Sequence, residues 1–127
     1  MIPIEMTYAF AFLFLISSLL IHVLILKKKI SYKIVNGGRS KNFEEQQKQS
    51  QASILIILVI FLYILYTMLF PSFRETIVFL IMTSLLVLLW LLGTVMQLLG
   101  TKFEKRVMFW INLTGLFSHV LLLISYF

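Results

Sequence analysis

The sequence predicts an all-α integral membrane protein, a bundle of four membrane-spanning helices, and two observations carry this prediction. Of the 127 residues, 61% are hydrophobic and only 13% are charged, whereas soluble domains are about half apolar and about a quarter charged. Four apolar stretches without Asp, Glu, Lys or Arg approach or exceed the ~20 residues that a helix needs to cross a bilayer. This composition argues against a soluble enzyme, a disordered chain and a nucleic-acid-binding domain.

The spans are expected at residues 8–26, 52–70, 76–99 and 107–127, in a single transmembrane domain that covers residues 1–127. Each is expected to be helical, because backbone groups in hydrocarbon must satisfy their own hydrogen bonds. The alternation of a membrane β-strand does not occur in these runs. The first span is not expected to be a cleaved signal peptide, since its lysines follow it rather than precede it.

The second helix is predicted to extend beyond the bilayer. Asn42 can cap a helix, and Glu45 three residues later completes a capping-box pattern. No proline or glycine follows until Pro71, so this helix should run from near Asn42 to about Phe70. Its glutamine-rich start is interpreted as a solvated helical face.

Two short turns should make the later helices antiparallel neighbours. Pro71 cannot continue a helix with normal hydrogen bonds, so residues 71–75 should join the second and third helices tightly. Gly100 is a typical helix terminator, and residues 100–106 should join the third and fourth helices in the same way.

The basic residues predict the orientation of the chain. Ten of the 11 Lys and Arg residues lie in residues 27–51 and 100–106. The positive-inside rule places these segments in the cytoplasm, so both termini are expected outside, in a multi-pass protein of the cell membrane. The net charge of +6 is expected to contact anionic lipids rather than nucleic acid.

Polar side chains within the spans supply the candidate binding site. Depth along the helices, at 1.5 Å per residue, places His22, Gln97 and Asn112 at a similar level below the cytoplasmic surface, with His119 deeper. One interpretation is that they hydrogen-bond the helices together. The alternative is a pocket open to the cytoplasm, where an anionic ligand could gain charge-assisted hydrogen bonds from Arg39, Lys41 and Lys48.

The sequence carries no recognisable catalytic set and no metal centre. There is no cysteine, and two histidines at different depths without an acid beside them do not make a zinc site. Small residues allow close helix contact, so the faces that carry Gly93, Gly100 and Gly115 predict a homo-oligomer, most simply a trimer, or a subunit of a larger membrane complex.

Three local patterns resemble the MAPEG superfamily, the membrane-associated proteins of eicosanoid and glutathione metabolism. Phe43-Glu44 followed by Lys48 is similar to the family's Phe-Glu pair with a basic residue four positions later. The run from Gly93 to Gly100 resembles the family's Gly-Arg-x-x-His/Tyr-x-x-Gly, and Arg106 matches a basic residue that often opens the fourth helix.

This sequence also departs from the MAPEG pattern. Ala52 and Leu55 replace the Asn and Glu that continue the second-helix motif, and Thr94 replaces the third-helix arginine. An alternative alignment on Asn42 and Glu45 restores the Asn–Glu pair and loses the Phe-Glu match. The resemblance implies a trimer that binds glutathione at the cytoplasmic side, with little thiol-transferase activity.

The resulting functional hypotheses fall into different classes. The first is a non-catalytic protein: a structural, accessory or immunity-type subunit, or a lipid-binding bundle. The second is a MAPEG-like glutathione- or lipid-binding trimer. The third is a small channel or transporter, which needs a polar face along a whole helix, and only the fourth helix approaches one.

Overall fold

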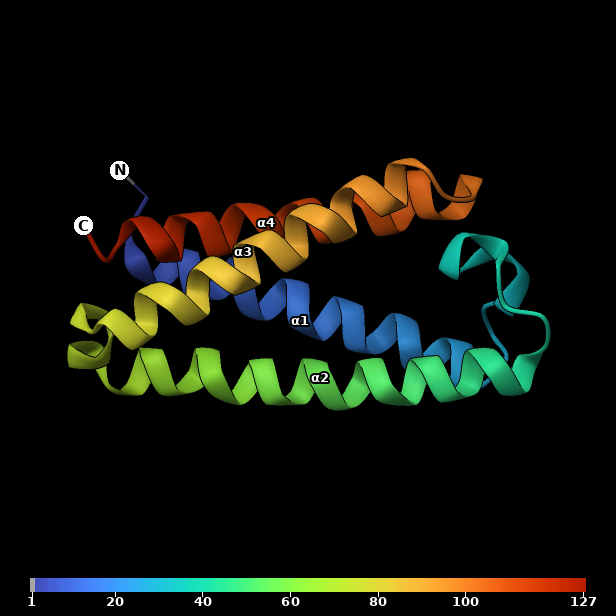
Figure 1. The fold of residues 1–127 in the computed structure, drawn as a ribbon, viewed down its shortest axis with the longest axis horizontal. Coiled ribbons are helices and arrows are strands. Elements are labelled where there is room, and N and C mark those ends of the chain that lie inside the picture. The colour runs from blue at the N-terminus through green and yellow to red at the C-terminus, as the bar shows by residue number, and fades with distance from the viewer. Residues whose placement is uncertain (1) are drawn as a thin grey trace.

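The computed structural model describes residues 2–127, which form four long helices and no strand (Figure 1). The helices are α1 (Ile4–Leu26), α2 (Phe43–Leu69), α3 (Ile77–Leu98) and α4 (Phe109–Ile124). A π-helical segment, η4 (Glu104–Met108), leads directly into α4. With η4 counted into the last helix, all four are long and apolar enough to cross a membrane. The all-α class and the four candidate spans are thus confirmed.

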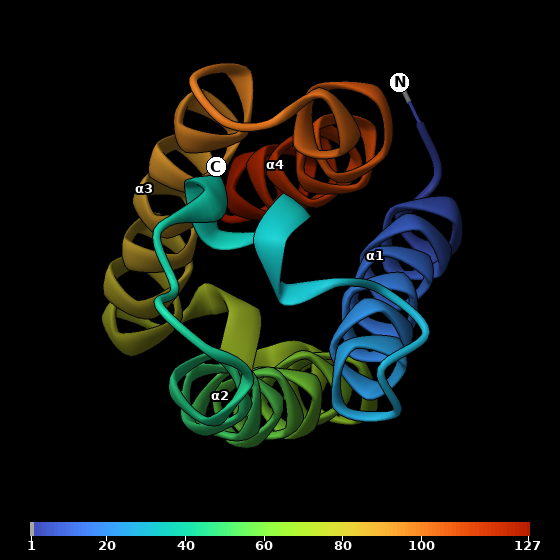
Figure 2. The same ribbon diagram turned by 90° about the vertical axis from the view of Figure 1, so that its right-hand side faces the viewer.

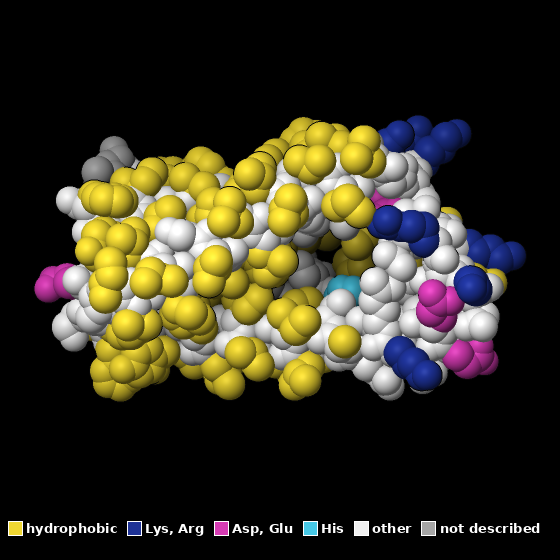
Figure 3. All heavy atoms as spheres, in the orientation of Figure 1, with side chains coloured by type: hydrophobic (Ala, Val, Ile, Leu, Met, Phe, Trp, Pro, Cys, Tyr) yellow, Lys and Arg dark blue, Asp and Glu magenta, His cyan; other side chains and the backbone are white. Residues whose placement is uncertain are grey.

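The two ends of the bundle differ in charge. Both chain termini lie at one end, together with the 3-10 turn η3 (Pro71–Glu75) (Figure 1), and we refer to this as the terminal end. The opposite end consists of residues 27–42, which include the short helices η1 (Tyr32–Ile34) and η2 (Asn36–Gly38), and of residues 99–106. Lys and Arg side chains gather there (Figure 3), and we refer to it as the basic end.

Residues 27–42 form a loop that folds back across the basic end of the bundle (Figure 2). Val35, which is only 1% exposed, packs there against Ile21 and Ile25 of α1. The reversal of the chain occurs at Gly37 and Gly38, whose φ angles of 63° and 71° lie in the left-handed region that glycine adopts without a steric penalty. The loop is therefore a packed cover for the bundle.

The start of α2 follows the sequence prediction closely. The Asn42 side chain accepts a hydrogen bond of 2.9 Å from the Glu45 backbone N–H. The Glu45 carboxylate accepts one of 3.1 Å from the backbone N–H of Lys41, one residue before the position that a standard capping box uses. The predicted helix from near Asn42 to about Phe70 is confirmed as Phe43–Leu69.

The bundle is open on one side, between α2 and α3. The sequence instead predicted that these two helices are close neighbours. Helix α1 packs against α2 and α4, and α3 packs against α4, but α2 and α3 share few contacts. They meet near the terminal end, where the hydroxyls of Tyr63 and Thr83 are 2.9 Å apart, and diverge toward the basic end (Figure 1). A tight turn fixes the antiparallel direction of two helices but not the angle between them.

The glycines predicted to pack between subunits are used inside this chain. A Cβ atom at Gly115 would lie 2.7 Å from the Phe14 ring of α1, and one at Gly93 would lie 3.5 Å from Asn112 of α4. A Cβ atom at Gly100 would lie 2.6 Å from the Glu104 carboxylate. These three glycines therefore allow close packing within one chain. The homo-oligomer remains a prediction, and its subunits would have to contact each other through other surfaces.

Candidate functional site

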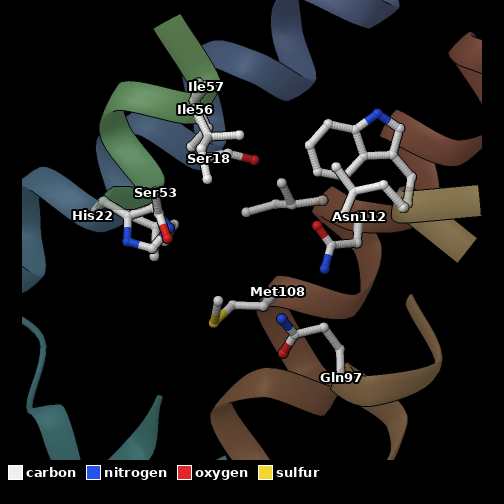
Figure 4. Close-up of a pocket in the computed structure, with 12 residues that line it drawn as sticks. Ser18, His22, Ser53, Ile56, Ile57, Gln97, Met108 and Asn112 are labelled. Carbon is white, nitrogen blue, oxygen red and sulfur yellow. The ribbon is translucent and has the colours of Figure 1, made fainter. Parts of the chain in front are cut away.

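The divergence of α2 and α3 leaves a cavity of about 240 Å³ in the half of the bundle near the basic end (Figure 4). All four helical segments contribute to its wall. The apolar part of the wall consists of Ile21, Ile56, Ile57, Leu89, Trp90, Met108 and Ile111. The polar part consists of Ser18, His22, Ser53, Gln97 and Asn112.

The cavity opens between α2 and α3. Ile56 of α2 and Leu89 of α3 line it and are 53% and 44% exposed. The space-filling view shows a hollow between these two helices, with a histidine beside it (Figure 3). Of the two histidines, His22 lines the cavity and is partly exposed, whereas His119 is completely buried. The opening therefore lies on the side of the bundle rather than at its end.

A second cavity of about 230 Å³ adjoins the first on the side of the loop. The two share His22, Ser53, Gln97 and Met108 in their walls. The second cavity adds polar groups from the loop and from the first turns of α2, namely Asn36, Arg39, Gln46 and Gln49, together with Glu104. The polar character of the wall thus increases toward the basic end.

The structure brings four of the six predicted site residues to these cavities. His22, Gln97 and Asn112 line the larger cavity, with His22 on the opposite side from the other two (Figure 4). Arg39 lines the smaller one.

Lys41 and Lys48 are exposed and line neither cavity. On α2, Gln46 and Ser50 face inward. Lys48 lies halfway between them in sequence, so the helical period turns its side chain the other way.

A chain of buried hydrogen bonds leads from the loop to His22. Ser40 Oγ donates to Gln46 Oε1 at 2.7 Å, and Gln46 Nε2 donates to Ser50 Oγ at 3.1 Å. Ser50 Oγ lies 3.2 Å from His22 Nδ1. Gln46 is 2% exposed and Ser50 is completely buried, so the interpretation of this glutamine-rich stretch as a solvated face is wrong for its inner side. The polar side chains are buried because they satisfy one another.

Glu104 joins the loop of residues 27–42 to the turn before α4 through hydrogen bonds. Its carboxylate, in a residue that is 4% exposed, accepts hydrogen bonds from the backbone N–H groups of Gly37 at 2.8 Å and Thr101 at 3.1 Å. The Thr101 hydroxyl in turn donates to the carbonyl of Ile34. This contact joins segments 67 residues apart in the sequence and closes the basic end over the cavities.

Three buried polar atoms have no hydrogen-bond partner among residues 2–127: Gln97 Oε1, Trp90 Nε1 and His119 Nε2. Gln97 and Trp90 belong to the wall of the larger cavity. His119 lies outside it, packed against Phe14 and Trp90, with Nδ1 2.7 Å from the carbonyl oxygen of Gly115. Gln97 Oε1 is thus an unpaired acceptor that is buried behind the surface of the cavity wall.

Sequence analysis did not identify Ser18, Ser53 or the buried part of α2 as parts of the site. A signal was present for α2, because Gln46, Ser50 and Ser53 follow one another at intervals of four and three residues. This spacing places them on one face of a helix, continuing from the loop into the apolar span. A polar stripe of this kind indicates an inward-facing site rather than a solvated face.

The chemistry that the larger cavity offers is hydrogen bonding within an apolar wall. Its polar groups are two amides, two hydroxyls and one imidazole. Comparison of the chain with protein-family models, curated proteins and solved structures found no match. The functional argument therefore depends on the geometry of the site.

Proposed function

We propose that this protein binds one amphiphilic molecule, such as a lipid, in the larger cavity and does not catalyse a reaction on it. The observation that carries this proposal is an opening between α2 and α3 with apolar residues at its sides and polar residues behind them. Small-molecule sites are mostly apolar clefts with a few polar groups, of ~300–1,000 Å³. The two adjoining cavities, of about 240 and 230 Å³, together fall in that range.

The position of the polar groups suggests how such a molecule would lie. Ile56 and Leu89 at the opening suit an acyl chain, and His22, Gln97 and Asn112 suit its polar head. The head would then point toward the basic end and the chain toward the opening between α2 and α3. This arrangement follows the order of polar and apolar groups in the surrounding bilayer.

The packed loop favours entry from the side. Val35 and Glu104 hold residues 27–42 against the basic end, so a ligand that entered there would have to displace buried contacts. The opening between α2 and α3 has no such cover. A molecule dissolved in the membrane can therefore reach the cavity without unfolding the loop.

The fluorescence of the native tryptophans can test whether a ligand occupies the cavity. Of its two tryptophans, Trp90 lines the cavity and Trp110 is 61% exposed on α4. In Trp110→Phe protein in lipid nanodiscs, a monoacylglycerol brominated along the first half of its acyl chain should quench Trp90 fluorescence to a plateau. In Trp90→Phe protein, quenching of Trp110 should rise in proportion to the amount added, without a plateau. Proportional quenching of Trp90 as well would refute the proposed site.

Filling the cavity should remove the plateau. In the Trp110→Phe background, Ser53→Phe places a ring in the cavity, and we expect saturable quenching of Trp90 to disappear. The matched control is Leu55→Phe, two residues away on the outer side of α2, where the native side chain is 65% exposed. This control should quench like the parent. If both variants keep the plateau, the ligand binds elsewhere on the protein.

A MAPEG-like, glutathione-binding protein is the second candidate, and the position of Arg39 favours it. Arg39 lines the smaller cavity with His22 and Gln97, at the end where the resemblance implies glutathione. At the position of the family's arginine, the Thr94 hydroxyl instead donates to the carbonyl of Trp90 at 2.7 Å. We therefore expect binding at most, in a trimer, and little turnover.

A glutathione titration tests this second candidate. If glutathione raises the unfolding temperature saturably, Arg39→Ala should abolish the increase and Lys48→Ala, outside both cavities, should preserve it. Conjugation of glutathione to a chlorodinitrobenzene-type electrophile at a substantial rate would contradict the expectation of little turnover. No thermal response in the wild type would eliminate this candidate.

We also propose that the basic end lies in the cytoplasm, with both termini outside, because of the positive-inside rule. The chain has no native cysteine, so a single thiol can be introduced at the exposed positions Lys41 or Ser72. In intact cells, Lys41→Cys should resist a membrane-impermeant thiol reagent and Ser72→Cys should react. Both should react after the membrane is permeabilised. The reverse pattern in intact cells would invert the orientation.

A further inference from the structure

The wall of the smaller cavity contains two charged side chains of opposite sign that do not pair with each other. Arg39 from the loop and Glu104 from the turn before α4 both line it. Within residues 2–127, the Glu104 carboxylate accepts hydrogen bonds only from backbone N–H groups, and the Arg39 side chain donates only to a backbone carbonyl. This inference rests on the proposed binding of an amphiphile and adds the chemical class of its head group.

One oxygen of the Glu104 carboxylate is unpaired. The residue is 4% exposed, and both of its hydrogen bonds, from Gly37 and Thr101, end on Oε1. Oε2 has no partner in residues 2–127, yet it is not one of the fully enclosed unpaired atoms there. It therefore keeps accessible surface toward the cavity that Glu104 lines. Because a buried charge without a partner costs free energy, Oε2 favours a ligand that donates a hydrogen bond, and most of all a cationic donor.

Arg39 supplies a positive charge to the same cavity. Its Nε donates to the carbonyl of Asn36 at 3.2 Å, which leaves its two terminal nitrogens without a partner in residues 2–127. The guanidinium lies against Gly37, where a Cβ atom would be 3.1 Å from Nε, and the N–H of the same glycine donates to Glu104. Both charged groups thus contact one residue of the loop. A guanidinium with free terminal nitrogens is a typical binding group for phosphate.

The neutral polar side chains on this wall pair with one another. Asn36 Nδ2 donates to Gln49 Oε1 at 2.6 Å, and Gln49 Nε2 donates to Asn36 Oδ1 at 3.3 Å. Gln46 is hydrogen-bonded to Ser40 and Ser50. The groups that remain for a ligand are therefore chiefly the two charges. Their complement is one negative and one positive group in the same molecule.

We propose that the smaller cavity holds a zwitterionic head group, with its phosphate at Arg39 and its primary ammonium at Glu104 Oε2, as in a lipid with an ethanolamine head. The two cavities share His22 and Gln97 in their walls, so one molecule can extend through both, with its acyl chain in the larger one. A choline head has the same charges but no N–H to donate. A glycerol head has hydroxyl donors but no positive charge.

The binding test compares three lysophospholipids with the same brominated acyl chain and an ethanolamine, choline or glycerol head. With Trp110→Phe protein in phosphatidylcholine nanodiscs, the ethanolamine compound should reach half-maximal quenching of Trp90 at about a tenfold lower amount than the other two. This is the ratio expected for one hydrogen bond between charged groups. Equal binding of all three, or tighter binding of the choline or glycerol compound, would overturn this inference.

The brominated monoacylglycerol separates failure of this inference from failure of the proposed function. If the monoacylglycerol reaches a plateau and none of the three lysophospholipids does, the cavity binds an amphiphile but not a zwitterionic head. If none of the four compounds reaches a plateau, the proposed function itself is refuted.

A water-soluble molecule could carry the same pair of charges, so a competition experiment identifies the source. Glycerophosphoethanolamine, which has the head group without an acyl chain, should not displace the bound ethanolamine lysophospholipid, because the packed loop covers the basic end. Recovery of Trp90 fluorescence on its addition would assign the site to a soluble zwitterion and overturn the lipid as its ligand.

Substitution of either charge should change the preference in a different way. In Glu104→Gln, the amide oxygen can still accept from the backbone, but the negative charge is gone. The preference should then turn to the glycerol head, whose net charge is negative. Arg39→Gln leaves the hydrogen bonds of Glu104 in place, and it should weaken binding of all three compounds severalfold while the ethanolamine head remains the tightest.

Matched controls make the same chemical changes outside both cavities. Glu44→Gln and Lys48→Gln alter exposed charges on α2 that line neither cavity, and both should bind the three compounds like the parent protein. If Arg39→Gln also binds like the parent, the phosphate does not lie at Arg39 and the proposal fails, whatever the stability of Glu104→Gln. Retention of the tenfold ethanolamine preference in Glu104→Gln would equally overturn the ammonium site.

Discussion

Replacement of Gly115 by alanine is expected to destabilise the bundle by about 1–3 kcal/mol, the range for overpacked cores, and replacement by leucine by more. The Cβ atom would lie 2.7 Å from three carbons of the Phe14 ring. That ring is 1% exposed and packs edge-on against Trp90, with ring centres 4.7 Å apart. Because the ring is surrounded, α1 and α4 must separate to admit even a methyl group.

A titration with a denaturing detergent in mixed micelles measures this free energy of unfolding. The matched control is Gly93→Ala, where the added Cβ would lie 3.5 Å from Asn112 Nδ2, an ordinary contact. It should be neutral or stabilising by up to about 1 kcal/mol, the gain in helix propensity. Phe14→Leu combined with Gly115→Ala should cost less than the sum of the single changes. Equal stabilities of the two alanine variants would show that α1 and α4 do not approach this closely.

Removal of the Glu104 carboxylate is expected to release the loop of residues 27–42 from the basic end. In Glu104→Ala, the backbone N–H groups of Gly37 and Thr101 lose their common acceptor. A hydrogen bond to a charged group contributes ~1.5–3 kcal/mol, which corresponds to roughly ten- to hundredfold faster amide hydrogen exchange at these two residues. Glu104→Gln retains one acceptor oxygen and should give an intermediate rate.

Two controls distinguish local release of the loop from loss of the fold. The amide of Phe14, in the core of the bundle, should exchange at the same rate in Glu104→Ala as in the wild type. Glu44→Ala removes a carboxylate from an exposed position in the first turn of α2 and should leave the exchange at Gly37 unchanged. If Gly37 exchanges equally fast in the wild type and Glu104→Ala, the carboxylate does not hold the loop.

The parts of the fold that the sequence predicted are those that depend on one segment of chain. Four apolar runs gave four helices, and Asn42 with Glu45 located the start of α2, because hydropathy and capping are local properties. The divergence of α2 and α3 depends instead on how α3 packs against its other neighbours, where the rings of Trp90 and Phe14 of α1 meet edge-on. The contact of Glu104 with Gly37 joins positions 67 residues apart, and no local pattern encodes it.

For the candidate site, the sequence predicted the depth of each residue along its helix but not the direction in which its side chain points. Counting residues along each helix was sufficient to place His22, Gln97 and Asn112 at one level, and all three line the same cavity. Depth alone says nothing about the direction in which a side chain points. For this reason the prediction included Lys48, which faces away, and omitted Ser53, which faces in.

The opening between α2 and α3 has a consequence for how occupancy of the cavity would be controlled. A molecule that enters through it leaves a bilayer whose acyl chains are as apolar as the cavity wall, so its own chain gains little from the transfer. Discrimination then depends on the head group, and the relevant concentration is the mole fraction in the membrane. Adding plain lipid vesicles should empty the cavity by dilution in two dimensions, even when the total aqueous concentration of ligand is unchanged. The protein would thus respond to membrane composition rather than to the supply in solution.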